Sequence, residues 1–247
     1  MRWKRHKLIQ GLFRERLHRF GATVSVDGRD AYCSVTNSGR LRELLFPGNQ
    51  LALRDHGTGL TAAGTKRKTR YSIHLAKFKG AWVSIEANLA PKLLQEAWEK
   101  GRVPELKRYD ILKAEVPLGP RTRFDFQARN SRTGEVAWIE VKCCTLVGPD
   151  GVGRFPDAPS ERASKHLREL MHLLKQEKTK SFAVFILQNP LGNAVAPKDD
   201  TDPVFGQTLR KAAKEGVTLL AWRAKVTLSG AELDRPVPVL LAQKPRE

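Results

Sequence analysis

The sequence has few cysteines and no long hydrophobic run, and each shortage excludes a class of protein. Three cysteines occur among 247 residues, and two of them, Cys143 and Cys144, are neighbours. Adjacent cysteines cannot pair without strain, so no disulfide framework is available and a reducing cytoplasm is the expected location. No segment approaches the roughly 20 apolar residues of a membrane-spanning helix, and charges interrupt the first segment too often for a signal peptide. We therefore expect a protein that is neither secreted nor embedded in a membrane.

Motifs of several common enzyme classes are also missing. Neither G-x-x-x-x-G-K-[ST] nor G-x-G-x-x-G stands between an expected strand and an expected helix, so a phosphate-binding loop for nucleotide hydrolysis is not expected. The cysteines do not form the C-x-x-C pairs of a zinc site, and no G-x-S-x-G marks a hydrolase serine. The chemistry that this chain could carry therefore rests on its carboxylates and bases.

Positive charge is abundant and unevenly distributed. Lys and Arg number 44 against 26 Asp and Glu, which gives a formal net charge of +18. Residues 1–85 hold 17 basic and 5 acidic side chains, whereas residues 86–247 hold 27 and 21. Such a concentrated surplus attracts polyanions, so it predicts contact with nucleic acid, DNA first and RNA left open. A basic surface that only keeps the protein soluble is the simpler alternative, but solubility does not require the asymmetry.

Short β-like runs separated by turn residues predict a small barrel in the first third of the chain. The runs cover residues 8–20, 23–26, 31–35, 50–53, 71–78 and 81–85. Their number and spacing match a five-stranded oligonucleotide/oligosaccharide-binding (OB) barrel. An amphipathic helix follows between residues 88 and 101. We therefore place the domain boundary before this helix, with domains at residues 1–86 and 87–247.

The second part of the chain has the pattern of an α/β domain. Its first three β-like runs, at residues 111–116, 121–128 and 136–141, predict an antiparallel meander. A helix at 160–176, a strand at 182–187, a helix at 203–214 and a strand at 217–222 follow. Strands separated by helices indicate a layered α/β arrangement. The sequence makes no prediction of the oligomeric state.

The strongest candidate for a catalytic site is a set of charged residues on the meander. Asp125 lies on its second strand, and Glu140 and Lys142 lie on its third. Strand side chains alternate, so Glu140 and Lys142 share a face, and strand pairing brings Asp125 beside them. Two converging carboxylates repel each other unless a divalent cation lies between them, and Mg²⁺, with Mn²⁺ as an alternative, suits such a site. The lysine could then hold the water that hydrolyses a phosphodiester.

This spacing alone is weak evidence, because charged strand residues are common. A solvated strand face with a glutamate and a lysine two residues apart is the alternative interpretation. Glu115, on the first strand of the meander, supplies a third carboxylate. With it, the catalytic interpretation and the alternative are about equally supported.

A series of short motifs follows in a fixed order along nearly the whole chain. The motifs are Asn37-Ser38-Gly39-Arg40, Pro47-Gly48, Lys66-Arg67-Lys68, Tyr71-Ser72, Phe124-Asp125-Phe126, Ile139-Glu140-Val141-Lys142, Phe155-Pro156-Asp157-Ala158, Glu161-Arg162, Lys165-His166-Leu167-Arg168-Glu169-Leu170 and Asp202-Pro203. Together they resemble the sugar fermentation stimulation protein A family. The F-P-D-A, E-R and K-H-L-R-E-L run is the most specific part of the resemblance.

The resemblance implies an N-terminal OB-like barrel and a C-terminal restriction-endonuclease-like domain of the PD-(D/E)xK type. It further implies DNA binding without marked sequence preference. Carried over to this chain, the nuclease pattern makes Asp125 and Glu140 metal ligands and Lys142 the water-positioning lysine. Glu115 is then the additional acidic residue of the site.

The helix expected at residues 160–176 flanks the active site if the nuclease fold is present. It carries Arg162, Lys165 and His166 within about one turn. We expect Arg162 or His166 to bind the scissile phosphate, and both are therefore candidate catalytic residues. An exposed polar helix face is the alternative.

The first domain has its own candidate contacts with nucleic acid. Lys66, Arg67, Lys68 and Arg70 form the densest basic cluster of the chain, and Tyr71 follows directly. Basic residues with an adjacent aromatic ring suit contact with the phosphate backbone and stacking on a base. Arg40, from the first motif, joins this set. A solvated charge run is the alternative interpretation.

Two functions from different classes follow. The first is a Mg²⁺-dependent nuclease that hydrolyses DNA with little sequence preference. The second is a non-catalytic DNA-binding protein that regulates sugar (maltose) metabolism, as an older assignment of the family has it. Converging carboxylates repel phosphate and are of no use to a protein that only binds DNA. The candidate site therefore favours the nuclease.

Overall fold

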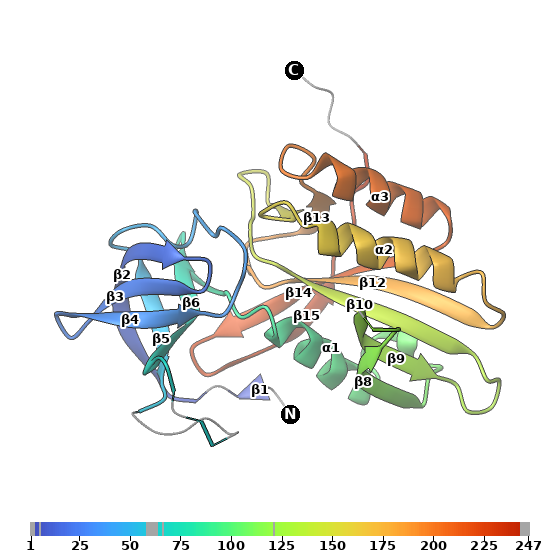
Figure 1. The fold of residues 1–247 in the computed structure, drawn as a ribbon, viewed down its shortest axis with the longest axis horizontal. Helices are drawn as coiled ribbons and strands as arrows, with labels where there is room; N and C mark the ends of the chain where they lie inside the picture. Colours follow the sequence, from blue (N-terminus) through green and yellow to red (C-terminus); the bar gives the residue numbers. More distant parts are fainter. Residues whose placement is uncertain (1–2, 5, 58–63, 66, 121, 243–247) are drawn as a thin grey trace.

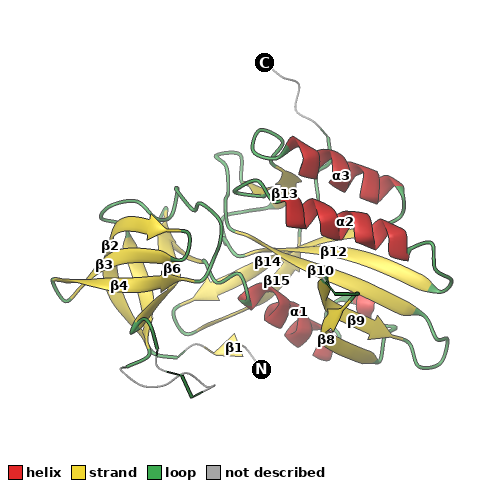
Figure 2. Cartoon of the chain, in the orientation of Figure 1, coloured by secondary structure: helices red, strands yellow, loops and turns green. Residues whose placement is uncertain are grey.

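The computed structural model describes residues 3–4, 6–57, 64–65, 67–120 and 122–242, which form a β-barrel and an α/β domain (Figures 1 and 2). The barrel strands are β2 (Leu8–His18), β3 (Gly21–Val26), β4 (Arg29–Val35), β5 (Gln50–Asp55) and β6 (Tyr71–Phe78), and β7 (Ala81–Ser84) extends the sheet beyond β6. Neighbouring strands pair in the order β4-β3-β2-β5-β6, and β4 also pairs with β6. This last pairing closes the five-stranded barrel, so the predicted OB domain is confirmed.

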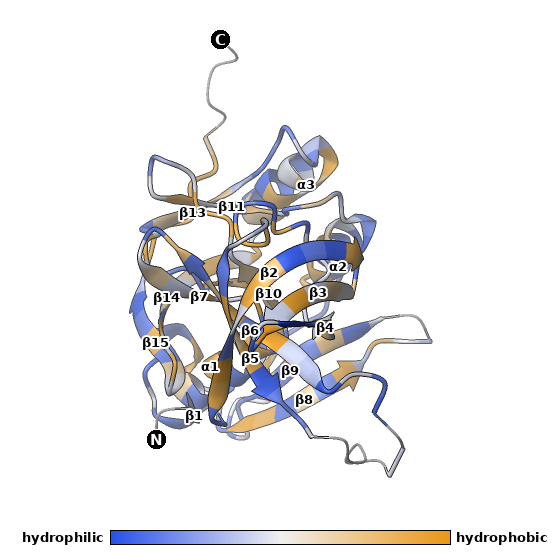
Figure 3. Ribbon diagram, turned by 90° about the vertical axis from the view of Figure 1, so that its left-hand side faces the viewer, coloured by the Kyte–Doolittle hydropathy of each residue, from blue (hydrophilic) through white to orange (hydrophobic). Residues whose placement is uncertain are grey.

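Alternation along β2 shows how the barrel forms around a core. Phe13 is buried in the barrel core, whereas its neighbours Leu12 and Arg14 are exposed. The same strand therefore carries both hydrophobic and strongly hydrophilic stretches (Figure 3). The hydrophilic residues stand on the outer surface of the barrel, where a ligand can reach them.

The second domain is built on one mixed sheet. Its strands are β8 (Ile111–Pro117), β9 (Arg123–Arg129), β10 (Val136–Cys144), β12 (Thr179–Leu187), β14 (Thr218–Thr227) and β15 (Gly230–Pro236). Strands β8, β9 and β10 form the predicted antiparallel meander, and β12 and β14 continue the sheet parallel to β10. The short strand β1 (Trp3–Lys4) pairs with β15, so the beginning of the described chain lies in this sheet rather than in the barrel. The division at residues 86/87 stays a prediction.

Helices cover both faces of the sheet (Figure 2). Helix α1 (Leu89–Glu99) packs in one core cluster with Ile139 and Val141, and helices α2 (Glu161–Leu173) and α3 (Pro203–Lys214) pack in another with Trp138. Side chains along β10 thus alternate between the two layers, as expected for a strand buried on both faces. Glu140 and Lys142 alternate with Ile139 and Val141, so they lie on the α2 face.

The sequence did not predict five short or terminal elements. These are β1, the 3₁₀ helix η1 (Pro104–Leu106), β11 (Val152–Phe155), β13 (Ala194–Pro197) and β15. Strands β11 and β13 pair with each other although about forty residues separate them. A run of four residues carries no local sequence signal that predicts pairing with a distant strand. Residue 121, where a predicted strand begins, lies outside the described residues. Among the described helices, none is both long and apolar enough to cross a membrane.

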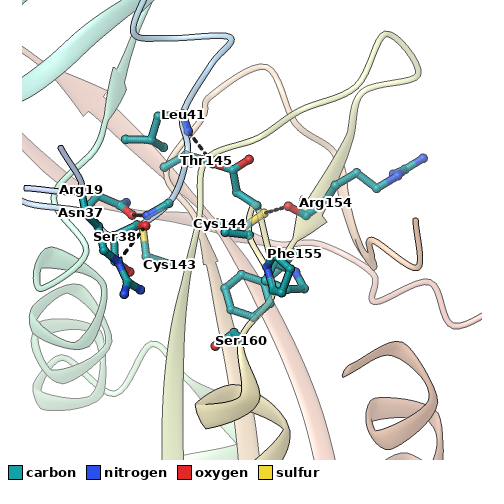
Figure 4. Close-up of a pocket in the computed structure, with 15 residues that line it drawn as sticks. Arg19, Asn37, Ser38, Leu41, Cys143, Cys144, Thr145, Arg154, Phe155 and Ser160 are labelled. Carbon is teal, nitrogen blue, oxygen red and sulfur yellow. Dashed lines mark hydrogen bonds between the residues drawn. The ribbon is translucent and has the colours of Figure 1, made fainter. Parts of the chain in front are cut away.

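The barrel and the α/β domain meet along loops that hydrogen-bond directly. Asp157 Oδ2 accepts a hydrogen bond of 2.5 Å from the backbone N–H of Leu41. A Cβ on Gly39 would lie 3.0 Å from the same oxygen, so glycine permits this close approach. The buried Gln188 amide, at the end of β12, donates to the carbonyls of Ser84 and Glu86 in the connection between the domains. A cavity of about 90 Å³ lies at this junction (Figure 4).

A half-buried carboxyl at the junction makes stability depend on pH. Burial raises the pKa of Glu43 to about 7 from 4.5, and the negative charge of Asp157 adds to the shift. The folded protein therefore holds this proton more tightly than the unfolded chain, and stability falls as pH rises from about 4.5 to about 7. We expect Glu43→Gln to gain about 2 kcal/mol in unfolding free energy relative to wild type across this interval.

Urea unfolding of both proteins at each pH measures the effect. The exposed Glu105 offers a matched control, since Glu105→Gln removes a carboxyl that water already solvates. The prediction is contradicted if the difference in unfolding free energy between wild type and Glu43→Gln does not change with pH.

Candidate active site

Glu140 is the most buried carboxylate of the candidate set, with a residue exposure of 5%. Its Oε1 accepts a hydrogen bond of 2.5 Å from Lys142 Nζ and lies 2.5 Å from His166 Nδ1. Its Oε2 is buried with no hydrogen-bond partner among the described residues. Burial acts to raise the pKa of Glu140, but the Lys142 charge and the His166 hydrogen bond outweigh it and leave this pKa below its ordinary value. Glu140 is therefore a charged carboxylate of fixed orientation, and its Oε2 is available to bind a ligand.

Asp125 stands where β9 and β10 part. Their ladder runs from Val136↔Arg129 to Ile139↔Phe126 and extends no further. The next N–H of β10 on that edge, from Val141, donates to Asp125 Oδ2 at 2.7 Å instead of to backbone. The carboxylate thus replaces a strand partner and is held beside the Glu140–Lys142 segment.

The two carboxylates repel each other. Burial raises the pKa of Asp125 from 3.8 to about 7, and the negative charge of Glu140 is the second cause of the rise. A cation between the two groups would remove this repulsion. The structure therefore brings together Asp125, Glu140 and Lys142, the three residues that the sequence analysis grouped.

Glu115 lies at the rim of the site. It occupies an unpaired position of β8, between Ala114↔Phe126 and Val116↔Phe124, with φ of 54°. Its side chain is 65% exposed and lies 3.5 Å from Arg123. Its negative charge also contributes to the raised pKa of Asp125. The role of Glu115 as an additional catalytic acid stays a prediction.

Helix α2 brings Arg162 and His166 to the site. The Ser160 hydroxyl caps the helix by accepting from the Ala163 N–H at 3.2 Å, which fixes where the helix begins. The His166 side chain is 4% exposed, and both ring nitrogens face protein groups: Nδ1 meets Glu140, and Nε2 accepts from Arg162 Nε at 3.5 Å. The ring is therefore placed to orient Glu140, whereas Arg162 is exposed at the surface. A direct contact between His166 and phosphate stays a prediction that this arrangement does not favour.

The sequence analysis assigned no role to the residues behind the histidine. The ring of Phe124, fully buried, lies 5.5 Å from the His166 ring and 5.6 Å from Trp138, centroid to centroid. These aromatic contacts restrict the His166 rotamer. The alternation of aromatics with Asp125 in R-F-D-F was the available signal, but it does not show that Phe124 reaches α2.

The described members of the predicted nucleic-acid set lie on two loops and at the start of β6. Arg70 is ion-paired with Asp55 at 2.8 Å and lies over the Tyr71 ring, with its Cζ 5.0 Å from the centroid. Arg67 is half-buried and Lys68 is exposed on the loop before β6, and Lys66 lies outside the described residues. Arg40 is exposed on another loop, next to the Leu41 that bonds to the α/β domain.

The site fits a hard divalent cation. Mg²⁺ and similar ions prefer carboxylate oxygens and often use one or two of them, with water completing the shell. Glu140 Oε2 offers a buried oxygen without a hydrogen bond, and the Asp125 carboxylate lies close enough to be destabilised by Glu140. Within the described residues, no group of three or more His, Cys, Asp or Glu side chains is arranged to hold a metal. The available ligand set is therefore this carboxylate pair.

Comparisons with known proteins agree over nearly the whole chain. A family model described as "SfsA N-terminal OB domain" matches residues 15–85, and one described as "Sugar fermentation stimulation protein RE domain" matches residues 88–230. The chain is 40% identical to a sugar fermentation stimulation protein homolog of Desulforamulus reducens, over 95% of this chain and 93% of that one. A homolog of Methanobrevibacter smithii is 36% identical over 91% and 94% of the two chains.

A solved structure has the same fold. It is described as Pyrococcus furiosus SfsA in complex with Ca²⁺, and it matches with a TM-score of 0.85 and 27% identity over 97% of this chain and 99% of that one. The second domain is thus of the restriction-endonuclease-like class, as the sequence analysis predicted. The chain belongs to the sugar fermentation stimulation protein (SfsA) family.

Proposed function

We propose that this protein is a Mg²⁺-dependent nuclease of the cytoplasm that hydrolyses DNA with little sequence preference. One observation carries the proposal: Glu140 is buried, charged and bound by both Lys142 and His166, with Asp125 alongside. A protein that only binds DNA gains nothing from two carboxylates that repel each other and the phosphate backbone. The basic surplus of residues 1–85 suits the phosphate backbone, which offers the same charge at every sequence.

Each residue of the site has a distinct role in this proposal. Asp125 and Glu140 would hold the cation, which supplies electrostatic stabilisation of the charge that develops on the phosphate. Lys142 Nζ, an ammonium with three donors, holds Glu140 with one of them and can orient the attacking water with another. His166 keeps Glu140 in position, and Arg162 is exposed beside it to contact a phosphate oxygen.

A relative supports the use of a divalent cation. The Pyrococcus furiosus structure is described as a complex with Ca²⁺, and that chain matches this one almost end to end. Ca²⁺ and Mg²⁺ are both hard cations that take oxygen ligands. Ca²⁺ binding in the relative is therefore consistent with a Mg²⁺ site here.

A cleavage assay tests the proposal. We expect the purified wild-type protein to cut DNA when Mg²⁺ or Mn²⁺ is present and to stop when the metal is chelated. Duplex, single-stranded and branched DNA, and RNA, should be offered in parallel, with Ca²⁺ as the comparison ion. Metal-dependent binding without cleavage on any substrate would overturn the nuclease and leave the DNA-binding alternative.

A further inference from the structure

Two exposed side chains lie across a glycine on the outer surface of the barrel. His18 ends β2, Tyr32 lies on β4, and β3 passes between them with Gly21 at its start. A Cβ on Gly21 would lie 2.5 Å from His18 Nε2, 2.5 Å from Tyr32 Oη and 2.7 Å from Tyr32 Cε2. The two rings can therefore lie against β3 only because residue 21 has no side chain.

Hydrogen bonds fix the orientation of both rings. His18 Nδ1 accepts from the backbone N–H of Phe20 at 3.2 Å, so in the neutral ring Nε2 carries the proton. Nε2 lies 2.9 Å from Tyr32 Oη and donates to it. The Tyr32 hydroxyl keeps its own proton to donate elsewhere. Tyr32 is 44% exposed, but its ring is held in one orientation. It therefore loses little conformational entropy when a ligand stacks on it.

A third exposed ring and an arginine lie in the turn that follows His18. Phe20, in the turn between β2 and β3, is 52% exposed, and the Arg19 guanidinium lies 5.5 Å from its ring centroid. Arg29, at the start of β4, and Arg40, in the loop that follows β4, are also exposed. Rings combined with arginine are the usual means of binding an unpaired strand, because bases stack on the rings while the cations meet the phosphates.

This surface borders the junction between the barrel and the α/β domain. Arg19 lines the junction cavity together with Cys143, Cys144 and Thr145, which follow Lys142 directly along the chain (Figure 4). Because Phe20 follows Arg19 directly in the chain, the rings lie next to this junction.

We propose that His18, Phe20 and Tyr32, the barrel platform, stack unpaired DNA bases, so that the substrate of the proposed nuclease is DNA with a single-stranded segment. The proposal rests on the proposed function, which it narrows. Bases inside a duplex present only their edges, so their faces cannot reach a flat ring on a protein surface. The Tyr32 hydroxyl can donate to a base acceptor that is free only in an unpaired strand.

Binding without metal tests the platform separately from cleavage. The probes are a blunt duplex and the same duplex with a single-stranded tail that carries a fluorescent adenine analogue, whose emission falls when it stacks. We expect Tyr32→Ala and Gly21→Ala each to bind the tailed DNA about tenfold more weakly than wild type and to lose the quenching. Gly21→Ala removes no ring, since its Cβ only displaces the two side chains.

Two controls sharpen the result. Tyr32→Phe keeps the ring and should keep most of the affinity and the quenching. The double variant Gly21→Ala/Tyr32→Ala should lose less affinity than the sum of the two single losses, because both changes act on Tyr32 and only the displacement of His18 is added. If Gly21→Ala does not fold, Tyr32→Ala decides, since an exposed side chain can be truncated without loss of the core.

Wild-type affinity in both alanine variants would overturn the platform, and so would an equal loss on blunt and tailed DNA. Quenching on an RNA tail but not on a DNA tail would overturn the assignment to DNA. Platform-dependent quenching in a protein that never cleaves would overturn the nuclease and leave the platform in place. If Tyr32→Ala binds tailed DNA as tightly as wild type and still cleaves it, the platform is overturned and the nuclease remains.

Discussion

Glu140→Gln is expected to lower metal-dependent DNA cleavage by about a thousandfold or more. The amide keeps the volume of the side chain but loses the charge that binds the cation. It also weakens the contacts with Lys142 and His166, which depend on an anionic partner at Oε1. Single-turnover cleavage with saturating protein measures the chemical step without interference from binding.

DNA affinity without metal should move in the other direction. Removing a buried negative charge near the phosphate path lowers repulsion, so Glu140→Gln should bind DNA as tightly as wild type or slightly more tightly. Glu161→Gln, a change at an exposed residue in the first turn of α2, controls for a general effect of charge. Cleavage that survives Glu140→Gln in clean preparations would assign the activity to another site or to a contaminant.

Lys142→Met is expected to lose cleavage by about a hundredfold or more while weakening DNA binding. Methionine keeps a long apolar stem but has no ammonium to hold the water or to bond Glu140. The loss of a positive charge beside the phosphate lowers affinity, the opposite sign to Glu140→Gln. The two variants therefore share a catalytic defect and differ in the direction of their binding change.

Lys165→Met is the matched control for this variant. Lys165 lies on α2, is 43% exposed and lies 3.7 Å from Glu169 Oε1, so its removal takes away a surface charge of the same type. DNA affinity should be measured at several salt concentrations for both variants and wild type. Each lost phosphate contact reduces the slope of log binding constant against log salt concentration, so a smaller slope shows which lysine contacted a phosphate. Full cleavage by Lys142→Met would exclude it as the residue that positions water.

The sequence was sufficient for the features that depend on local periodicity. The antiparallel meander followed from three β-like runs, and the grouping of Asp125 with Glu140 and Lys142 followed from strand alternation and pairing. Helix α2 was placed correctly to within a few residues because an apolar stripe at helical spacing is a local signal.

Features that depend on distant packing could not be predicted. The contact between His166 and Glu140 requires α2 to pack across β10 at the position of Glu140. No spacing in the sequence specifies that position. The same holds for the contact of Tyr32 with His18 over Gly21, where the strand register decides which side chains meet. The basic cluster was visible in the sequence, but the ion pair between Arg70 and Asp55 was not.

The pairing of β1 with β15 gives the barrel two tethers instead of one. The chain leaves the large sheet after β1, builds the barrel and returns through the connection that Gln188 holds at Ser84 and Glu86. A body fixed at both of its ends can tilt but cannot revolve freely about a single linker. In the proposed function, DNA held on the barrel platform would stay at a nearly constant distance from Glu140, and cleavage would fall at a fixed length from the bound bases.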